Sequence, residues 1–135
     1  MSEPCRGHGM KSAVAREAGA SPPSRGNVVF IASHELGTGD PELGPVLMRM
    51  FILTLKESDP LPAAMIFVNS GVRLTTAGSL LLGDLRDLEA RGVEVLSCGT
   101  CLDFYQLKDK LQAGTVTTMR RIVGLLSCAE RVIRP

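Results

Sequence analysis

Two cysteines separated by two residues are the part of this chain best suited to chemistry. Cys98 and Cys101 stand in the stretch SCGTCLDFY, directly after a short apolar run. Thr100 and Asp103 match the Ser/Thr-x-x-Asp/Glu capping pattern, which places Cys101 in the first turn of a helix and Cys98 just before it. The free N–H groups and the positive dipole end at that point favour a thiolate, whereas the Asp103 carboxylate opposes one. We therefore predict a reactive thiol, without a value for its pKa.

The spacing alone leaves four kinds of cysteine pair open. A structural zinc site takes four ligands, but one CxxC supplies two, and no second CxxC or His pair follows it. His34 could add a third ligand or act as a general base. A thioredoxin-type disulfide exchanger fits better, although no proline can be identified as its cis-Pro partner. The other two are a persulfide carrier, whose second thiol resolves the persulfide, and a pair of small buried hydrophobes.

The elements that would position these cysteines alternate between strand and helix. Continuous apolar runs predict buried strands, and apolar residues spaced by three and four predict helices. The predicted strands are 27–33, 64–68, 93–96 and 131–133, and the predicted helices are about 41–57, 77–91, 101–111 and 117–127. Such alternation implies right-handed βαβ units. We expect a three-layer α/β domain of flavodoxin-like or Rossmann-like character, with a mostly parallel sheet of four to five strands and helices on both faces.

Three loops leave the carboxyl ends of the predicted strands and should meet at one edge of the sheet. Ligand sites in open α/β sheets form at this edge. The loops are polar or rich in glycine, and their residues are Gly37, Thr38, Gly39 and Asp40; Asn69, Ser70 and Gly71; and Cys98, Gly99, Thr100 and Cys101. Because Gly99 has no side chain, a partner could approach Cys98 closely. We predict that the first two loops shape a pocket around the two cysteines.

The first of these loops does not form a dinucleotide-binding motif. Its glycines miss the G-x-G-x-x-G spacing because Glu42 occupies the place of the third glycine. Asp40 and Glu42 would also put two carboxylates at the N-terminus of the next helix, where they repel a pyrophosphate. A tight turn, with Asp40 as N-cap and Pro41 at the first helical position, is the simpler interpretation.

Four motifs that occur in order along the chain resemble a known family. They are LGTGDPELG at 36–44, FVNSGV at 67–72, LTTAGS at 74–79 and CGTCL at 98–102. In these motifs the chain is similar to the DsrE/DsrF-like domain of YedF-type proteins, which are described as sulfurtransferase-like proteins of selenium metabolism. The resemblance runs from about residue 27 to the C-terminus.

The resemblance implies a DsrE-like fold, a homo-oligomer and a role for each cysteine. In related sulfur-relay subunits the sulfur-carrying cysteine follows the strand whose place is taken by 93–96, so the acceptor role falls on Cys98 and the resolving role on Cys101. YedF-type proteins usually begin with a TusA-like carrier domain, for which residues 1–26 are too short. A separate donor, such as a TusA-like carrier, is therefore implied. The family's Thr-Asn-Met-Tyr is replaced here by Thr-Thr-Met-Arg at 117–120, so we expect that wall of the site to differ.

Composition excludes several other functions. The chain has 135 residues, enough for one domain, and residues 1–26 are rich in Gly, Pro and Ser, which predicts a disordered tail or linker before a domain at 27–135. A net charge of +1 and 4% aromatic residues argue against nucleic-acid binding. No run approaches the roughly 18 apolar residues of a membrane span, and the N-terminus lacks the apolar stretch of a signal peptide. We expect a cytoplasmic protein that needs no metal or cofactor.

Together these features predict a sulfur or selenium relay protein. It would carry sulfane sulfur as a persulfide on Cys98, assisted by Cys101, and exchange it with donor and acceptor proteins, as a sulfurtransferase-like carrier. The alternative is a non-catalytic oligomeric binding or regulatory module, whose CxxC is structural or binds metal.

Overall fold

The computed structural model describes residues 26–135, in which strands and helices alternate. The strands are β1 (Asn27–Ile31), β2 (Ala64–Phe67), β3 (Glu94–Cys98), β4 (Thr115–Thr117) and β5 (Arg131–Ile133). The α-helices are α2 (Leu43–Leu55), α3 (Leu82–Ala90), α4 (Gly99–Phe104) and α5 (Met119–Cys128), and two 3-10 helices are η3 (Asn69–Thr75) and η4 (Lys108–Lys110). Apart from Gly26, the tail predicted for 1–26 lies outside the described residues.

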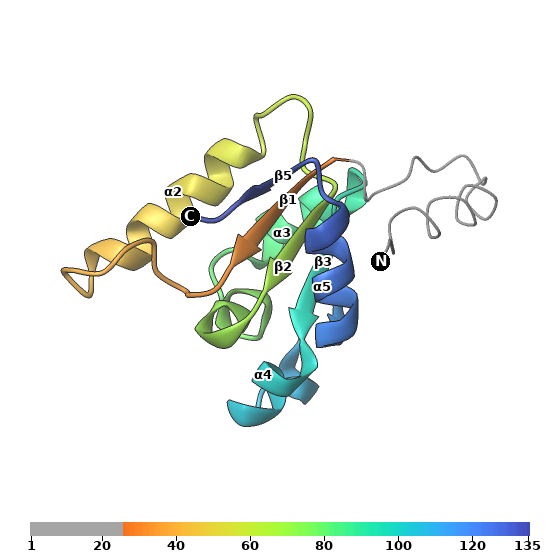
Figure 1. Ribbon diagram of the computed structural model, residues 1–135. Helices are drawn as coiled ribbons and strands as arrows, with labels where there is room; N and C mark the ends of the chain where they lie inside the picture. The colour runs from red at the N-terminus through yellow and green to blue at the C-terminus, as the bar shows by residue number, and fades with distance from the viewer. Residues whose placement is uncertain (1–25) are drawn as a thin grey trace.

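The five strands form one parallel sheet in the order β4-β3-β2-β1-β5 (Figure 1). All four residues of β2 are buried, as expected for an inner strand covered on both faces. The predicted α/β fold is confirmed. Because the strands run in the same direction, the carboxyl ends of β1, β2 and β3 lie at one edge, and the segments that follow them leave from there.

Helices cover the two faces of the sheet unequally. On one face, α2 and α3 pack on the sheet through Ile52 and Leu85 and build the larger core. On the other face, α5 contributes Ile122 and Leu125 to a smaller core, which also contains Cys98. In Figure 1, α5 lies on the side of the sheet facing the viewer and α3 lies behind it. The environment of Cys98 is therefore set by α5.

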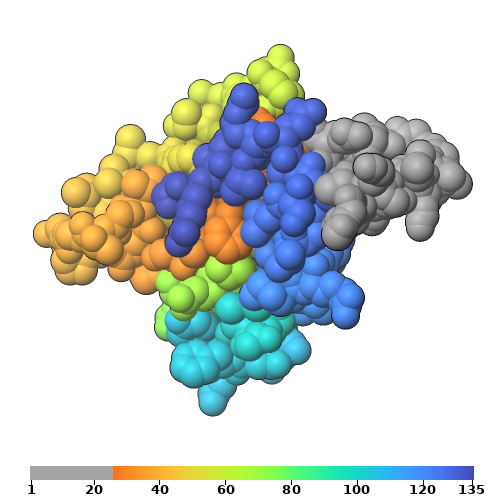
Figure 2. All heavy atoms as spheres, in the orientation of Figure 1, coloured from red at the N-terminus to blue at the C-terminus, as the bar shows by residue number. Residues whose placement is uncertain are grey.

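The helix α5 covers only part of the sheet face on which the smaller core lies. Phe30 of β1 is half-buried and Val132 of β5 is 43% exposed. Figure 2 shows part of β1 still visible between α5 and the C-terminal segment. The Arg134 guanidinium lies 5.8 Å from the centre of the Phe30 ring and covers it in part. The open half is thus the β1–β5 side, and Cys98 lies in the half that α5 closes.

Several predicted boundaries are wrong for reasons of tertiary contact. The helix predicted at 77–91 begins only at Leu82, because residues 69–75 form η3 and Thr76 pairs with Leu111 in an antiparallel bridge. The helix predicted at 101–111 ends at Phe104. The strand β4 was not predicted, since its three residues are too few to show a strand pattern.

Candidate functional site

The two cysteines differ in exposure. Cys98 ends β3 and is the N-cap residue of α4, and Cys101 lies in the first turn of that helix. Strand alternation puts Cys98 on the same face as Leu96, where Ile122 of α5 packs. Only 2% of Cys98 is exposed, whereas Cys101 is half-buried. The expectation that a partner could approach Cys98 closely is therefore wrong for this buried side chain, and Cys101 is the more accessible of the two thiols.

The sulfur of Cys101 accepts a backbone hydrogen bond. The N–H of Asn69 donates to Cys101 Sγ over 3.0 Å, from a residue held at a φ of +54°. Burial raises the pKa of the Cys101 thiol, the Asn69 N–H lowers it, and contact with the Cys98 thiol raises it again, so the net shift is upward. The helix α4 has six residues, too few for a strong dipole to reverse this. Cys101 must therefore lose its proton to react, with the Asn69 N–H ready to stabilise the thiolate.

Asn69 is held on its other side by α4. Its Oδ1 accepts a hydrogen bond from the Tyr105 hydroxyl at 3.0 Å. The Arg73 guanidinium lies 4.7 Å from the centre of the Tyr105 ring, and Phe104 meets that ring edge-on. Backbone and side chain of one asparagine thus bind Cys101 of α4 and Tyr105, the C-cap residue of that helix. The sequence contained one usable signal that Tyr105 lies near the site, because it follows Cys101 by four residues and residues four apart share a helix face. It contained no such signal for Arg73.

Ser70 connects the β1 loop to η3. Its Oγ accepts the backbone N–H of His34 at 3.2 Å and lies 3.1 Å from His34 Nδ1, while His34 Nε2 lies 3.4 Å from a Glu35 carboxylate oxygen. A Cβ at Gly44 would come within 2.7 Å of the Glu35 Cβ, so this glycine makes room for the glutamate. Among the described residues, no hydrogen bond joins His34 to either cysteine.

The glycines of the second and third loops serve close packing. A Cβ at Gly71 would lie 2.5 Å from the Ile31 carbonyl oxygen, and one at Gly99 would lie 3.1 Å from Val116 Cγ1. Gly71 thus lets η3 approach β1, and Gly99 lets α4 approach β4. Thr100 is exposed, and within the described chain α4 has no side-chain cap, so the predicted capping box is absent.

The Gly37–Asp40 loop stands apart from the cysteines. Asp40 Oδ1 accepts the N–H groups of Glu42 at 2.8 Å and Leu43 at 3.3 Å, so the predicted tight turn forms. The helix begins only at Leu43, with Glu42 as its N-cap residue, so the predicted N-cap role of Asp40 and the helical position of Pro41 are wrong. The loop lines a hollow of about 280 Å³ together with Leu36, Leu43, Gly44 and Leu47. Figure 1 shows it extending away from α4, and no hydrogen bond of residues 26–135 joins it to either cysteine. The structure therefore brings two of the three predicted loops together.

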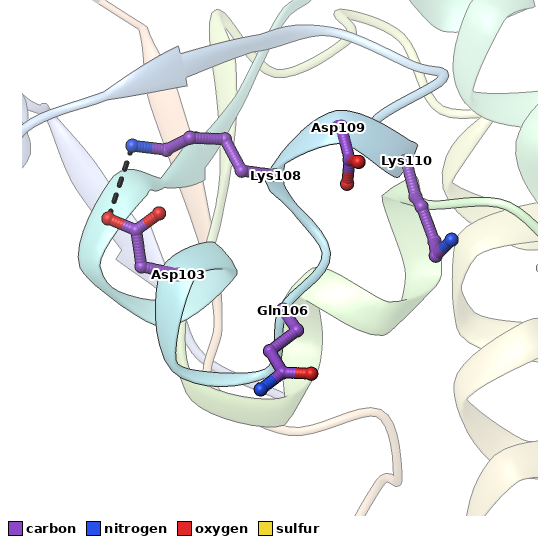
Figure 3. Close-up of a pocket in the computed structure, with 5 residues that line it drawn as sticks. All are labelled: Asp103, Gln106, Lys108, Asp109 and Lys110. Atoms are coloured by element: carbon purple, nitrogen blue, oxygen red, sulfur yellow. Dashed lines mark hydrogen bonds and ion pairs between the residues drawn. The ribbon is translucent and has the colours of Figure 1, made fainter.

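A second hollow is formed by the end of α4, the turn after it and η4. It measures about 570 Å³ and is lined by Asp103, Gln106, Lys108, Asp109 and Lys110 (Figure 3). Lys108 Nζ reaches across to Asp103 Oδ2 at 3.2 Å, as Figure 3 shows. Two acidic and two basic side chains give the hollow no dominant charge. Neither Cys98 nor Cys101 lines this hollow.

Thr117 is the neighbour of Cys98 in the adjacent strand. The register pairs the two residues across β3 and β4, so both side chains are on the face covered by α5. Thr117 is 6% exposed, and its Oγ1 is the only buried side-chain nitrogen or oxygen of residues 26–135 without a hydrogen-bond partner. On the opposite face, Ser97 and Thr75 bond to each other at 2.8 Å.

Residues 26–135 contain neither a cluster of metal-binding side chains nor a membrane-spanning helix. They contain no group of three or more His, Cys, Asp or Glu side chains placed to hold a metal ion. None of their helices combines the length and the apolar character that crossing a bilayer requires.

Known proteins resemble this chain in fold. No protein-family model and no curated protein sequence matches it. Among solved structures, the ychN protein of E. coli aligns over 82% of this chain and 99% of its own, with 18% identity and a TM-score of 0.61. MTH1491 of Methanobacterium thermoautotrophicum aligns over 82% of this chain and 99% of its own, with 18% identity and a TM-score of 0.56. BT1422 of Bacteroides thetaiotaomicron aligns over 81% of this chain and 94% of its own, with 13% identity and a TM-score of 0.59; both are described as proteins of unknown function. At these identities the similarity shows the shared three-layer α/β fold alone.

Proposed function

We propose that this protein is a sulfur or selenium relay protein that carries sulfane sulfur as a persulfide on the Cys98–Cys101 pair. The single observation that carries the proposal is the half-buried Cys101 sulfur, held by the Asn69 N–H at 3.0 Å and in contact with a second thiol. An N–H donor stabilises the anionic sulfur on which persulfide exchange depends. The four motifs that resemble the DsrE-like domain of YedF-type proteins support the same function.

The different exposures of the two thiols support an order in which they would act. A donor persulfide, R–S–SH, meets Cys101 first; the Cys101 thiolate attacks its outer sulfur, R–S⁻ leaves, and a persulfide forms on Cys101. The adjacent Cys98 thiol can then take the outer sulfur, which leaves Cys98 persulfidated and Cys101 reduced. If Cys98 instead attacks Cys101 Sγ, a Cys98–Cys101 disulfide forms and hydrosulfide is released. Cys98 remains the proposed carrier, and Cys101 becomes the entry point.

The partners follow from the same chemistry. The proposed donor and acceptor are thiol proteins, with a separate TusA-like carrier as the donor, in the cytoplasm. We also propose a homo-oligomer, because three apolar side chains of α2 are about half exposed: Leu43, Val46 and Met50.

Loading with a persulfide donor tests the proposal. The full chain is treated with inorganic polysulfide, alkylated with iodoacetamide and examined by mass spectrometry, with fragmentation between residues 98 and 101 to separate the two sites. We expect one added sulfur in the wild type and none in Cys101→Ser. We expect Cys98→Ser to hold sulfur on Cys101 only. If Cys101→Ser loads as readily as the wild type, the assignment of the entry thiol is wrong.

One observation favours the alternative of a non-catalytic module. Cys98 is 2% exposed and packs with Ile122 and Leu125, as a structural cysteine does. If the protein is a non-catalytic module, we expect slow alkylation of both thiols near neutral pH, or stoichiometric zinc after purification. If the protein is a sulfur relay, we expect Cys101 to be alkylated much faster than Cys98 and to take up sulfur.

A further inference from the structure

Thr117 carries a buried polar group that the fold does not use. Its Oγ1 has no hydrogen-bond partner, although it is shielded from water. A buried hydroxyl that makes no hydrogen bond destabilises the folded state, and valine would fill the same space without that cost. The β-branched shape that suits a strand therefore does not explain the hydroxyl.

The hydroxyl lies next to the proposed carrier sulfur. Thr117 pairs with Cys98 in the register of β3 and β4, and neighbouring strands are about 4.8 Å apart. Both side chains are on the sheet face covered by α5, where Ile122 and Leu125 exclude water. In so apolar a place, a single free donor matters more than it would at the surface.

Two other donors near the cysteines are already engaged. The Asn69 N–H bonds Cys101 Sγ, and the Ser97 hydroxyl faces the opposite side of the sheet and bonds Thr75. Among the described residues, Thr117 is thus the buried side-chain donor on the Cys98 face that makes no hydrogen bond.

We infer that the Thr117 hydroxyl is the hydrogen-bond donor for the outer sulfur or selenium atom carried on Cys98. The inference rests on the proposed function and adds the subsite that receives the atom. Starting from Cys101–S–S⁻, the Cys98 sulfur bonds to the outer sulfur, the bond from that sulfur to Cys101 breaks, and the Cys98 proton passes to Cys101. The products are Cys98–S–S⁻ and Cys101–SH, with no net oxidation. Thr117 O–H then donates to the new terminal anion and draws the atom toward Cys98.

Isosteric substitution of the hydroxyl tests the inference on the full chain. Wild type, Thr117→Val, Thr117→Ser and the control Thr115→Val, an exposed position on the same strand face, are loaded with inorganic polysulfide and mapped as above. A hydrogen bond to a charged group corresponds to about tenfold in an equilibrium. We expect Thr117→Val to lower the ratio of sulfur on Cys98 to sulfur on Cys101 by about tenfold, while Thr117→Ser and Thr115→Val keep the wild-type ratio.

The melting temperature of each variant is a second measurement, which distinguishes a role of the hydroxyl in holding sulfur from a role in stabilising the fold. Because the hydroxyl has no partner in the resting state, Thr117→Val should melt no lower than the wild type. An unchanged ratio in Thr117→Val, or an equal loss in Thr117→Ser, overturns the inference and leaves the proposed function standing. Wild-type protein that takes up no sulfur on either cysteine overturns the proposed function itself.

Discussion

The loops that follow β1 and β3 leave the same edge of the sheet, yet they are packed very differently. Residues 37–40 are exposed, and Asp40 bonds only to the start of the helix that follows it. In the β3 loop, Cys98 is buried and Cys101 is bonded by Asn69 from the neighbouring η3. Glycine and polar residues are common to both loops. Contacts between loops, and not their composition, therefore distinguish a candidate site from a turn.

Alanine at Gly71 of η3, the element that bonds the β3 loop, and at Gly37 of the β1 loop should give the largest contrast. Gly71→Ala places a Cβ 2.5 Å from the Ile31 carbonyl oxygen, a main-chain atom that cannot move alone, and should cost about 3 kcal/mol of unfolding free energy. Gly37→Ala has open space around it and suffers only from its φ of +80°, which should cost about 1 kcal/mol. Urea unfolding measures both, and equal losses would contradict the difference in packing.

Substitution of Asn69 should have an intermediate effect. Asn69→Ala loses the bond from Tyr105 and strains a residue at a φ of +54°, for a total of about 2 kcal/mol. Asn69→Gly keeps the backbone conformation and should lose only about 1 kcal/mol, as should the control Tyr105→Phe. A glycine variant as unstable as the alanine variant would show that the backbone conformation contributes nothing.

The smallest expected effect is a shift in the pH dependence of Cys101 alkylation. Contact with Cys98 helps raise the pKa of Cys101, so Cys98→Ala should move the alkylation profile of Cys101 to lower pH. In the wild type, the profile should rise at higher pH than that of an ordinary cysteine. The folded chain favours the protonated Cys101 thiol. The contribution of this thiol to the free energy of unfolding is therefore present at neutral pH and is lost as the pH rises through the pKa of the folded state. Iodoacetamide rates between neutral and alkaline pH measure the shift; an unmoved profile would contradict the contact.

Much of the fold could be predicted from the sequence because the inner strands are buried on both faces. Burial of this kind requires continuous apolar runs, and β1 and β2 were located from such runs. The strand β3 was located from a short β-like run at 93–96, which Glu94 interrupts. In β4, by contrast, Thr115 and Val116 are exposed and the strand depends on pairing with residues 96–98. The 3-10 helix η3 similarly depends on Gly71 fitting against β1. Local patterns do not record pairings made with distant residues.

The chemistry of this chain, two thiols in the first turn after the third predicted strand, was determined by the sequence alone, since residue type and spacing are local properties. Tertiary structure decided which thiol can be reached, because α5 closes over Cys98 from a distant part of the chain. It also decided that Asn69 bonds both the Cys101 sulfur and the Tyr105 hydroxyl, and that Thr117 pairs with Cys98 in the neighbouring strand. Exposure and hydrogen bonding of this kind depend on how separate elements pack, and that packing exists only in the folded chain.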